Sequence, residues 1–118
     1  MKNVFIIEDD HNLQKLIKTL LEMEGFLVYS PSMIEEKTIL QELRGIQADI
    51  VFMDVNLKHL SGFSLIKVIK NDDQLKAIKI IMSSGMCLQD ECLEAGANAF
   101  IQKPYMPAQL IDLLKNNG

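Results

Sequence analysis

The stretch DIVFMDVNLKHLSG, residues 49 to 62, decides the fold. It opens with a continuous apolar run, Ile50 to Met53, that ends abruptly on a carboxylate, Asp54. A strand in which successive residues are all apolar is covered on both faces, as in a parallel sheet between two helix layers. Asp54 then stands at the carboxyl end of a buried strand. Either the strand simply leaves the core there, or the strand serves to hold this carboxylate.

The rest of the chain repeats the same alternation between short apolar runs and stretches with apolar residues at helical spacing. Strands are expected at 4–7, 26–29, 50–53, 78–82 and 99–101, and helices at 12–24, 32–43, 62–71, 87–95 and from 107 onward. Five such units predict an α/β fold, an open, doubly wound, five-stranded parallel sheet with five helices. Sheets of this kind bind ligands beyond the carboxyl ends of their strands.

Length and composition exclude several classes of protein. The 118 residues suit a single domain, 1–118, and no apolar run approaches the roughly 20 residues of a membrane helix. The start, MKNVFIIEDD, has an apolar stretch of only four residues, which is too short for a signal peptide, so we expect a cytoplasmic protein. The initial Met favours a place for this domain at the N-terminus of its chain. A net charge of −4 without a basic cluster argues against nucleic-acid binding. Cys87 and Cys92 match no zinc pattern and are expected to be buried or half-buried thiols on a helix.

Polar residues gather directly after the predicted strands. Two like charges about 4 Å apart repel by about 4 kcal/mol at an effective dielectric of 20, so clustered carboxylates take up protons or recruit a cation. Because the ligands here are all oxygens, Mg²⁺ suits them. A carboxylate nucleophile, a metal, a lysine and a hydroxyl together indicate phosphoryl transfer. The residues concerned are Glu8, Asp9, Asp10, Asp54, Ser83, Ser84, Gly85, Gln102, Lys103 and Pro104.

Each of these residues, taken alone, also fits an ordinary structural role. Acids after a strand are often solvated, and Asp10 or Asn12 can cap the following helix. Ser83 can be a turn hydroxyl and Lys103 a surface lysine. The histidines, His11 and His59, can ligate a metal but fit solvated positions better. Four groups nevertheless stand at strand ends of one domain: the acids after the first strand, Asp54, Ser83 and Lys103. This coincidence favours a functional site.

With these residues in view, the chain resembles the receiver domain of bacterial two-component response regulators over essentially its whole length. The matching segments are FIIEDD (5–10), VFMD (51–54), LSGF (60–63), IIMSSG (80–85) and EAGANAFIQKP (94–104). None is specific alone, but together, in this order and spacing, they are. The resemblance implies the flavodoxin-like, chemotaxis-regulator-like fold with strand order 2-1-3-4-5.

The resemblance also implies a role for each matching residue. Asp54 would accept a phosphoryl group from the phosphohistidine of a sensor kinase or phosphotransfer protein, with Mg²⁺ as the cofactor. The implied metal ligands are Glu8, Asp9, Asp54 and the backbone carbonyl of Asn56. Lys103 and Ser83 would contact the phosphoryl group, Ser83 and Phe100 would act as switch residues, and Ser84, Lys58 and Pro104 would flank the site, with a bond before Pro104 that is commonly cis. Phe100 also fits an ordinary strand position.

The implied function is that of a signalling switch and not of a turnover enzyme. Phosphorylation would shift the surface formed by the fourth helix, fifth strand and fifth helix, and so control a downstream protein, an output domain or a phosphorylation-dependent dimer.

Three departures from the family pattern stand out. Lys58 occupies a position where the family often has proline, and we expect it to alter the lifetime of the phosphoryl group. The stretch from Ser83 to Lys103 is slightly short, which puts the usual output surface in doubt. Serine replaces the commoner threonine at position 83.

Other functions compete with this interpretation. A receiver-fold interaction module that acts without phosphorylation is one, although Asp54, Asp9, Ser83 and Lys103 are all retained. A haloacid-dehalogenase-type phosphatase would need a second aspartate two residues after the first, where this chain has Asn56. Nucleotide binding is disfavoured because neither GxxxxGK[ST] nor GxGxxG occurs.

Overall fold

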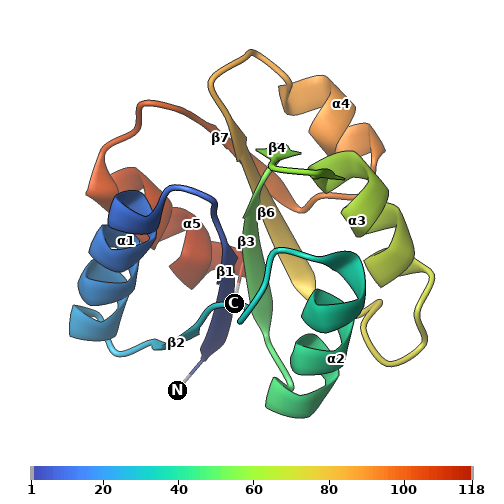
Figure 1. Cartoon of the computed structure of the whole chain (residues 1–118). Helices are drawn as coiled ribbons and strands as arrows, with labels where there is room; N and C mark the ends of the chain where they lie inside the picture. Colours follow the sequence, from blue (N-terminus) through green and yellow to red (C-terminus); the bar gives the residue numbers. More distant parts are fainter. Residues whose placement is uncertain (1, 118) are drawn as a thin grey trace.

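Five parallel strands form the centre of the computed structural model, which describes residues 2–117. The sheet has the order β2-β1-β3-β6-β7 (Figure 1). When only the five strands of this sheet are counted along the chain, β6 is the fourth and β7 the fifth, so the order is the predicted 2-1-3-4-5. The fold prediction is confirmed. The strands are β1 (Asn3–Ile7), β2 (Leu27–Tyr29), β3 (Ile50–Asp54), β6 (Lys79–Ser84) and β7 (Ala99–Gln102). Two further short strands, β4 (Asn56–Leu57) and β5 (Leu60–Ser61), form a small antiparallel hairpin that the sequence did not predict.

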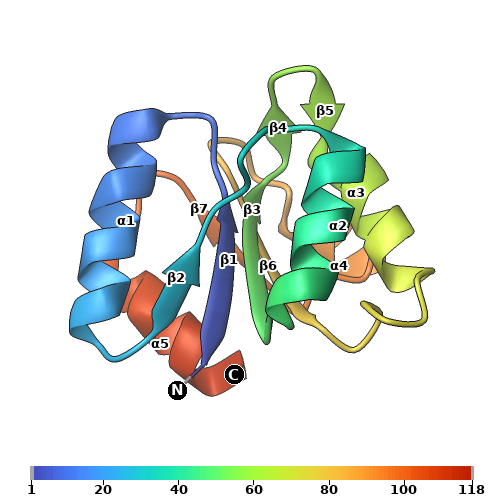
Figure 2. The same ribbon diagram turned by 60° about the horizontal axis from the view of Figure 1, so that its bottom comes forward.

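Helices cover both faces of the sheet, as Figures 1 and 2 show from two directions. One face carries α1 (His11–Met23) and α5 (Pro107–Asn117), and the other carries α2 (Glu36–Ile46), α3 (Gly62–Lys70) and α4 (Gln89–Glu94). Asp10 begins α1 by accepting hydrogen bonds from the amides of Asn12 and Leu13 at 3.0 and 3.1 Å. The helix ends just before Gly25, which has a φ of +92°. None of the helices in the described part of the chain is long and apolar enough to cross a bilayer.

The apolar strand runs build two cores because successive side chains point to opposite faces of the sheet. Val51 and Met53 pack with the α2, α3 and α4 side, whereas Ile50 and Phe52 pack with the α1 and α5 side. All five residues of β3 are buried. Burial of each large apolar side chain stabilises the fold by about 1.5–3 kcal/mol. These side chains fix the carboxyl end of β3, where Asp54 stands.

Two helices begin later than predicted. The second helix starts at Glu36 and not at Ser32, because the Glu42 carboxylate accepts hydrogen bonds from the amide and hydroxyl of Ser32 at 2.9 and 3.0 Å. This contact keeps the segment before Glu36 outside the helix. The fourth helix was expected at 87–95 but spans only six residues, Gln89–Glu94, which agrees with the shortness noted between Ser83 and Lys103.

The prediction for the cysteines was half wrong. Cys92 is buried on α4, as expected, but Cys87 is exposed and precedes that helix. The thiol of Cys87 lies 3.4 Å from the side-chain oxygen of Gln102. The late start of the helix leaves Cys87 in the loop after β6, where no core element covers it.

Candidate functional site

Asp54 is the last residue of β3, and its neighbour in the sheet register is Ser83 on β6. Both residues are buried, at 8% and 1% exposure. The Ser83 hydroxyl donates a hydrogen bond to Asp54 Oδ1 at 2.6 Å. The amide of Val55 donates to the Ser83 carbonyl at 2.9 Å, so the sheet ladder continues one residue past the carboxylate. The structure thus brings the predicted acceptor and the predicted hydroxyl into direct contact.

Lys103 reaches the same carboxylate from the end of β7. Its ammonium group donates to Asp54 Oδ2 and to Glu8 Oε1, each at 2.9 Å. The peptide bond between Lys103 and Pro104 is cis, as the resemblance implied. The Lys103 amide donates to the Ser84 carbonyl at 2.8 Å, which ties the start of this loop to β6. Residues that are up to 95 positions apart in the sequence therefore meet at one edge of the sheet.

The three consecutive acids after β1 have three different partners. Glu8 is buried and pairs with Lys103. Asp9 is half-buried, and its Oδ2 accepts a hydrogen bond from the backbone amide of Lys58 at 2.5 Å. Asp10 is exposed and caps α1, so the capping alternative holds for this residue. Glu8 thus contacts the Lys103–Asp54 cluster, Asp9 contacts the loop after Asp54, and Asp10 caps the helix.

Burial and charge set the protonation of the cluster. Burial, together with the neighbouring Asp54 carboxyl group, raises the pKa of Glu8 to about 7, although Lys103 opposes the shift. Burial on its own would lower the pKa of Lys103, but hydrogen bonds to Glu8 and Asp54 outweigh it and raise that pKa. Lys103 therefore stays charged at neutral pH. Glu8 is partly protonated there, which limits the repulsion between the carboxylates.

The donor set fits a hard divalent cation. Asp54 ends β3 and Asp9 lies two residues beyond the end of the neighbouring strand β1, so both offer carboxylate oxygens at this edge of the sheet, and the exposed Asn56 follows two residues after Asp54. Within residues 2–117, no three His, Cys, Asp or Glu side chains are grouped so as to hold a metal by themselves. Mg²⁺ does not need such a cage, because it typically takes one or two carboxylates and keeps several waters. Glu8 and Asp54 already share the Lys103 ammonium, so a cation at this site would have to compete with that lysine for their oxygens.

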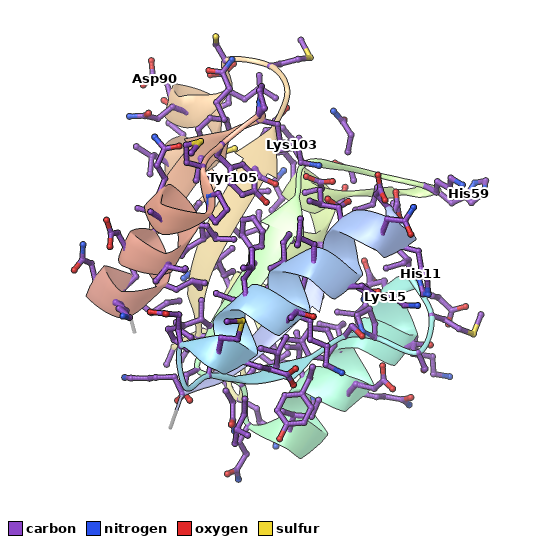
Figure 3. All side chains as sticks on the ribbon, turned by 90° about the vertical axis from the view of Figure 1, so that its left-hand side faces the viewer. His11, Lys15, His59, Asp90, Lys103 and Tyr105 are labelled. Carbon is purple, nitrogen blue, oxygen red and sulfur yellow. The ribbon has the colours of Figure 1, made fainter. Side chains whose placement is uncertain are left out.

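The remaining predicted residues lie around this cluster or apart from it. Ser84 is buried, and its hydroxyl accepts a hydrogen bond from the Met86 amide at 3.0 Å. Phe100 is half-buried on β7 and packs against the core on the α4 side. His11 and His59 are both exposed, and Figure 3 shows His59 at the hairpin tip, away from Lys103. The structure therefore gives neither histidine a place in the site.

Two features of the site escaped the sequence analysis. The amide of Lys58 binds Asp9, a contact that no side-chain pattern could reveal because the donor is backbone. Gly62, at the start of α3, packs so closely that a Cβ there would lie 2.5 Å from the Asp54 carbonyl oxygen. The segment LSGF (60–63) carried part of the family resemblance but gave no sign of this close approach.

The chain is similar to known proteins over nearly its whole length. Residues 4–115 match the model of the response regulator receiver domain. The polar-differentiation response regulator DivK of Brucella anthropi is 28% identical, and the match covers 98% of this chain and 94% of that protein.

Solved structures show the same fold. The chemotaxis response regulator CheY4 of Vibrio cholerae superposes with a TM-score of 0.89 at 21% identity, covering 100% of this chain and 99% of that one. The N-terminal domain of the nisin resistance regulator NsrR gives a TM-score of 0.83 at 27% identity, covering 99% of this chain and 97% of that one. The family model spans nearly the whole chain and the fold agrees with it. The chain therefore belongs to the response regulator receiver domain family of two-component systems.

Proposed function

We propose that Asp54 accepts a phosphoryl group from a phosphohistidine of a sensor kinase or phosphotransfer protein. One observation carries the proposal. The Asp54 carboxylate, 8% exposed, is bound on one oxygen by the Ser83 hydroxyl and on the other by the Lys103 ammonium. A lysine and a hydroxyl that converge on a single carboxylate at a strand end form a set of donors for an incoming phosphoryl group.

In the proposed step, a carboxylate oxygen of Asp54 attacks phosphorus in line with the leaving imidazole nitrogen. A new O–P bond forms, the N–P bond breaks, and the histidine leaves as neutral imidazole after taking up a proton. Lys103 stabilises negative charge on the phosphoryl oxygens, and the Ser83 hydroxyl moves its hydrogen bond from the carboxylate to one of them. Water later hydrolyses the aspartyl phosphate, so the chain is a switch and not a turnover enzyme.

Mg²⁺, when bound, would supply further neutralisation of the phosphoryl charge. Asp9, Asp54 and the backbone carbonyl of Asn56 would hold the ion. Glu8 would be an outer neighbour of these ligands, held in place by its ion pair with Lys103. The chemistry of these donors supports the assignment, since each offers a hard oxygen.

Surfaces near the site support contacts with protein partners. An apolar groove of about 520 Å³ opens between α1 and α5 and includes Lys103 in its lining. Leu16 of α1 is 54% exposed beside it, which suits approach by a phosphohistidine-bearing protein. On the output side, withdrawal of Ser83 toward the phosphoryl group would let Phe100 turn inward. That movement would alter the surface of α4, β7 and α5 for a downstream protein, an output domain or a second phosphorylated copy.

The acceptor role is tested by incubating the chain with Mg²⁺ and a phosphodonor and measuring its intact mass. Acetyl phosphate serves first, and a phosphohistidine-bearing protein serves as the second donor because a small molecule can fail to enter the site. We expect one phosphoryl adduct on the wild-type chain and none on Asp54→Asn. Asp73→Asn, an exposed aspartate after α3, is the matched control and should keep the adduct.

Two results would reject the acceptor role: no adduct on the wild-type chain with either donor, or an adduct that persists in Asp54→Asn. The first result would favour an interaction module that acts without phosphorylation.

A further inference from the structure

The hydrogen bond between Asp9 and Lys58 joins two segments that are 49 positions apart in the sequence. Asp9 lies two residues beyond the end of β1, and Lys58 lies between the short strands β4 and β5. The donor is the backbone amide, 2.5 Å from Asp9 Oδ2, while the side chain of Lys58 belongs to an exposed residue. A charge-assisted hydrogen bond from an amide to a carboxylate is among the stronger kinds in proteins.

The hairpin explains why this amide is available. Leu57 pairs with Leu60, so Lys58 and His59 form a two-residue loop. Of these two residues only His59 has a positive φ, 59°. Leu57 and Leu60 flank this loop as a strand pair, and the Lys58 amide donates outward from it to the Asp9 carboxylate.

The same hairpin carries Asn56, two residues before Lys58. Where the hairpin ends, the Gly62 amide donates a hydrogen bond to the Val55 carbonyl at 2.7 Å, which joins the end of the hairpin to the residue after β3. The Lys58 amide thus links the segment that contains Asn56 directly to Asp9. If Asp9 and the Asn56 carbonyl hold a cation, as the proposed function requires, this bond fixes two ligands from separate segments relative to each other.

We propose that the backbone amide of Lys58 is a positioning group for the Mg²⁺ site. By holding the Asp9 carboxylate against the loop of Asn56, it prepares both ligands before the cation binds. Outer hydrogen-bond partners of this kind orient a ligating carboxylate, and their loss typically weakens metal binding about 10–100-fold. The inference rests on the proposed function for its metal, and it assigns the effect to the amide and not to the charge of the lysine.

Two substitutions separate the amide from the side chain. Lys58→Pro removes the N–H, and proline suits the first loop position of a two-residue turn whose positive φ is at the second. Lys58→Ala removes the side chain and its charge but keeps the N–H. We measure the Mg²⁺ dissociation constant of each full chain by calorimetric titration. Lys58→Pro should raise the constant about ten-fold, whereas Lys58→Ala should change it by less than about two-fold.

A second readout distinguishes positioning from general damage. Relative to the wild-type chain, the rate at which Lys58→Pro takes up the phosphoryl group from acetyl phosphate should be lowest at limiting Mg²⁺, and the deficit should shrink as the Mg²⁺ concentration is raised. Equal Mg²⁺ dissociation constants for the two variants would overturn the inference, as would a phosphorylation deficit that does not shrink as the Mg²⁺ concentration is raised.

The hydrogen bond itself is tested without the proline variant. In the wild-type chain the Lys58 amide should exchange slowly with solvent, and Asp9→Ala should accelerate that exchange. Unchanged exchange would contradict the contact. Failure of the proposed acceptor role of Asp54 would be distinguishable from failure of this inference. The former would leave the wild-type chain without an adduct at any Mg²⁺ concentration, whereas the latter concerns only the differences between the Lys58 variants.

Discussion

Lys103 dominates the charge of the site at the scale of single residues. Its ammonium is shared by two carboxyl groups, those of Glu8 and Asp54, which are only 6% and 10% exposed as side chains. One positive charge cannot neutralise both, and Asp9 adds a further carboxylate nearby. The site therefore carries a net negative charge when Glu8 is ionised, and a negative site attracts a cation.

Tyr105, two residues after Lys103, shows that not every polar group near the site has a partner. Its ring packs edge-on against Phe52, with centroids 6.2 Å apart. Its hydroxyl is buried and has no hydrogen-bond partner among residues 2–117. Burial raises the pKa of Tyr105 to about 12. The hydroxyl therefore stays protonated and contributes a desolvation cost to the folded state.

Replacing Tyr105 by phenylalanine should stabilise the protein. Removing an unpaired buried hydroxyl while keeping the ring should raise the free energy of unfolding by about 1 kcal/mol. Urea denaturation measures the change, and Tyr29→Phe is the control because Tyr29 is exposed on β2 and should change little. A loss of stability in Tyr105→Phe would mean that the hydroxyl has a partner after all.

At the scale of elements, the junction between β3 and α3 positions Asp54. Gly62 opens α3 against the backbone of the strand end, and a Cβ there would lie 2.5 Å from the Asp54 carbonyl oxygen and 2.9 Å from Val55 Cα. Both atoms are backbone, so no side chain can rotate away to make room. The junction therefore requires glycine for space.

Gly62→Ala tests this junction. The added methyl group should force the backbone apart and lower the free energy of unfolding by about 2 kcal/mol. Gly45→Ala is the matched control, because Gly45 lies in α2 and a Cβ added there would have no atom within 4 Å. That change should stabilise the helix by about 0.5–1 kcal/mol. Similar destabilisation in both variants would contradict a specific steric role for Gly62.

The elements also show what the sequence could and could not predict. The apolar run before Asp54 and the polar residues after each strand predicted the sheet and the meeting of Asp54, Ser83 and Lys103, because parallel strands end at one edge. The start of α2 could not be predicted, since it depends on a side-chain contact between Ser32 and Glu42.

The β4–β5 hairpin lacked a sequence signal as well. Its loop residues are Lys58 and His59, and the usual two-residue turns carry Asn-Gly or Asp-Gly. The contact between the Lys58 amide and Asp9 was hidden for a further reason. It depends on where the backbone of this hairpin lies, and residue types do not specify that position.

At the scale of the whole molecule, an ion pair ties two neighbouring elements of one helix layer together. Arg44 near the end of α2 binds Asp72 in the loop after α3. The hydrogen bond from Arg44 lowers the pKa of Asp72. A carboxyl group with a depressed folded-state pKa stabilises the protein above its unfolded pKa and loses that contribution as pH falls through the folded value.

The stability of the wild-type chain should therefore fall more steeply below pH about 4 than that of Arg44→Gln. Above that pH, wild type should be the more stable of the two, and the difference should shrink on acidification. Urea denaturation at a series of pH values measures both curves. A constant difference between the two curves across the acid range would show that protonation of Asp72 does not affect stability through its pair with Arg44.

The buried strand β3 holds the Asp54 carboxylate at the edge of the sheet, and we propose that this carboxylate becomes phosphorylated. Borohydride reduction of the phosphorylated chain tests it most directly, because an acyl phosphate is reduced to an alcohol and aspartate becomes homoserine. Peptide mass mapping after reduction should place homoserine at position 54 and at no other aspartate. Homoserine at Asp9 or elsewhere, or none in a chain that carries the phosphoryl adduct, would contradict phosphorylation of Asp54.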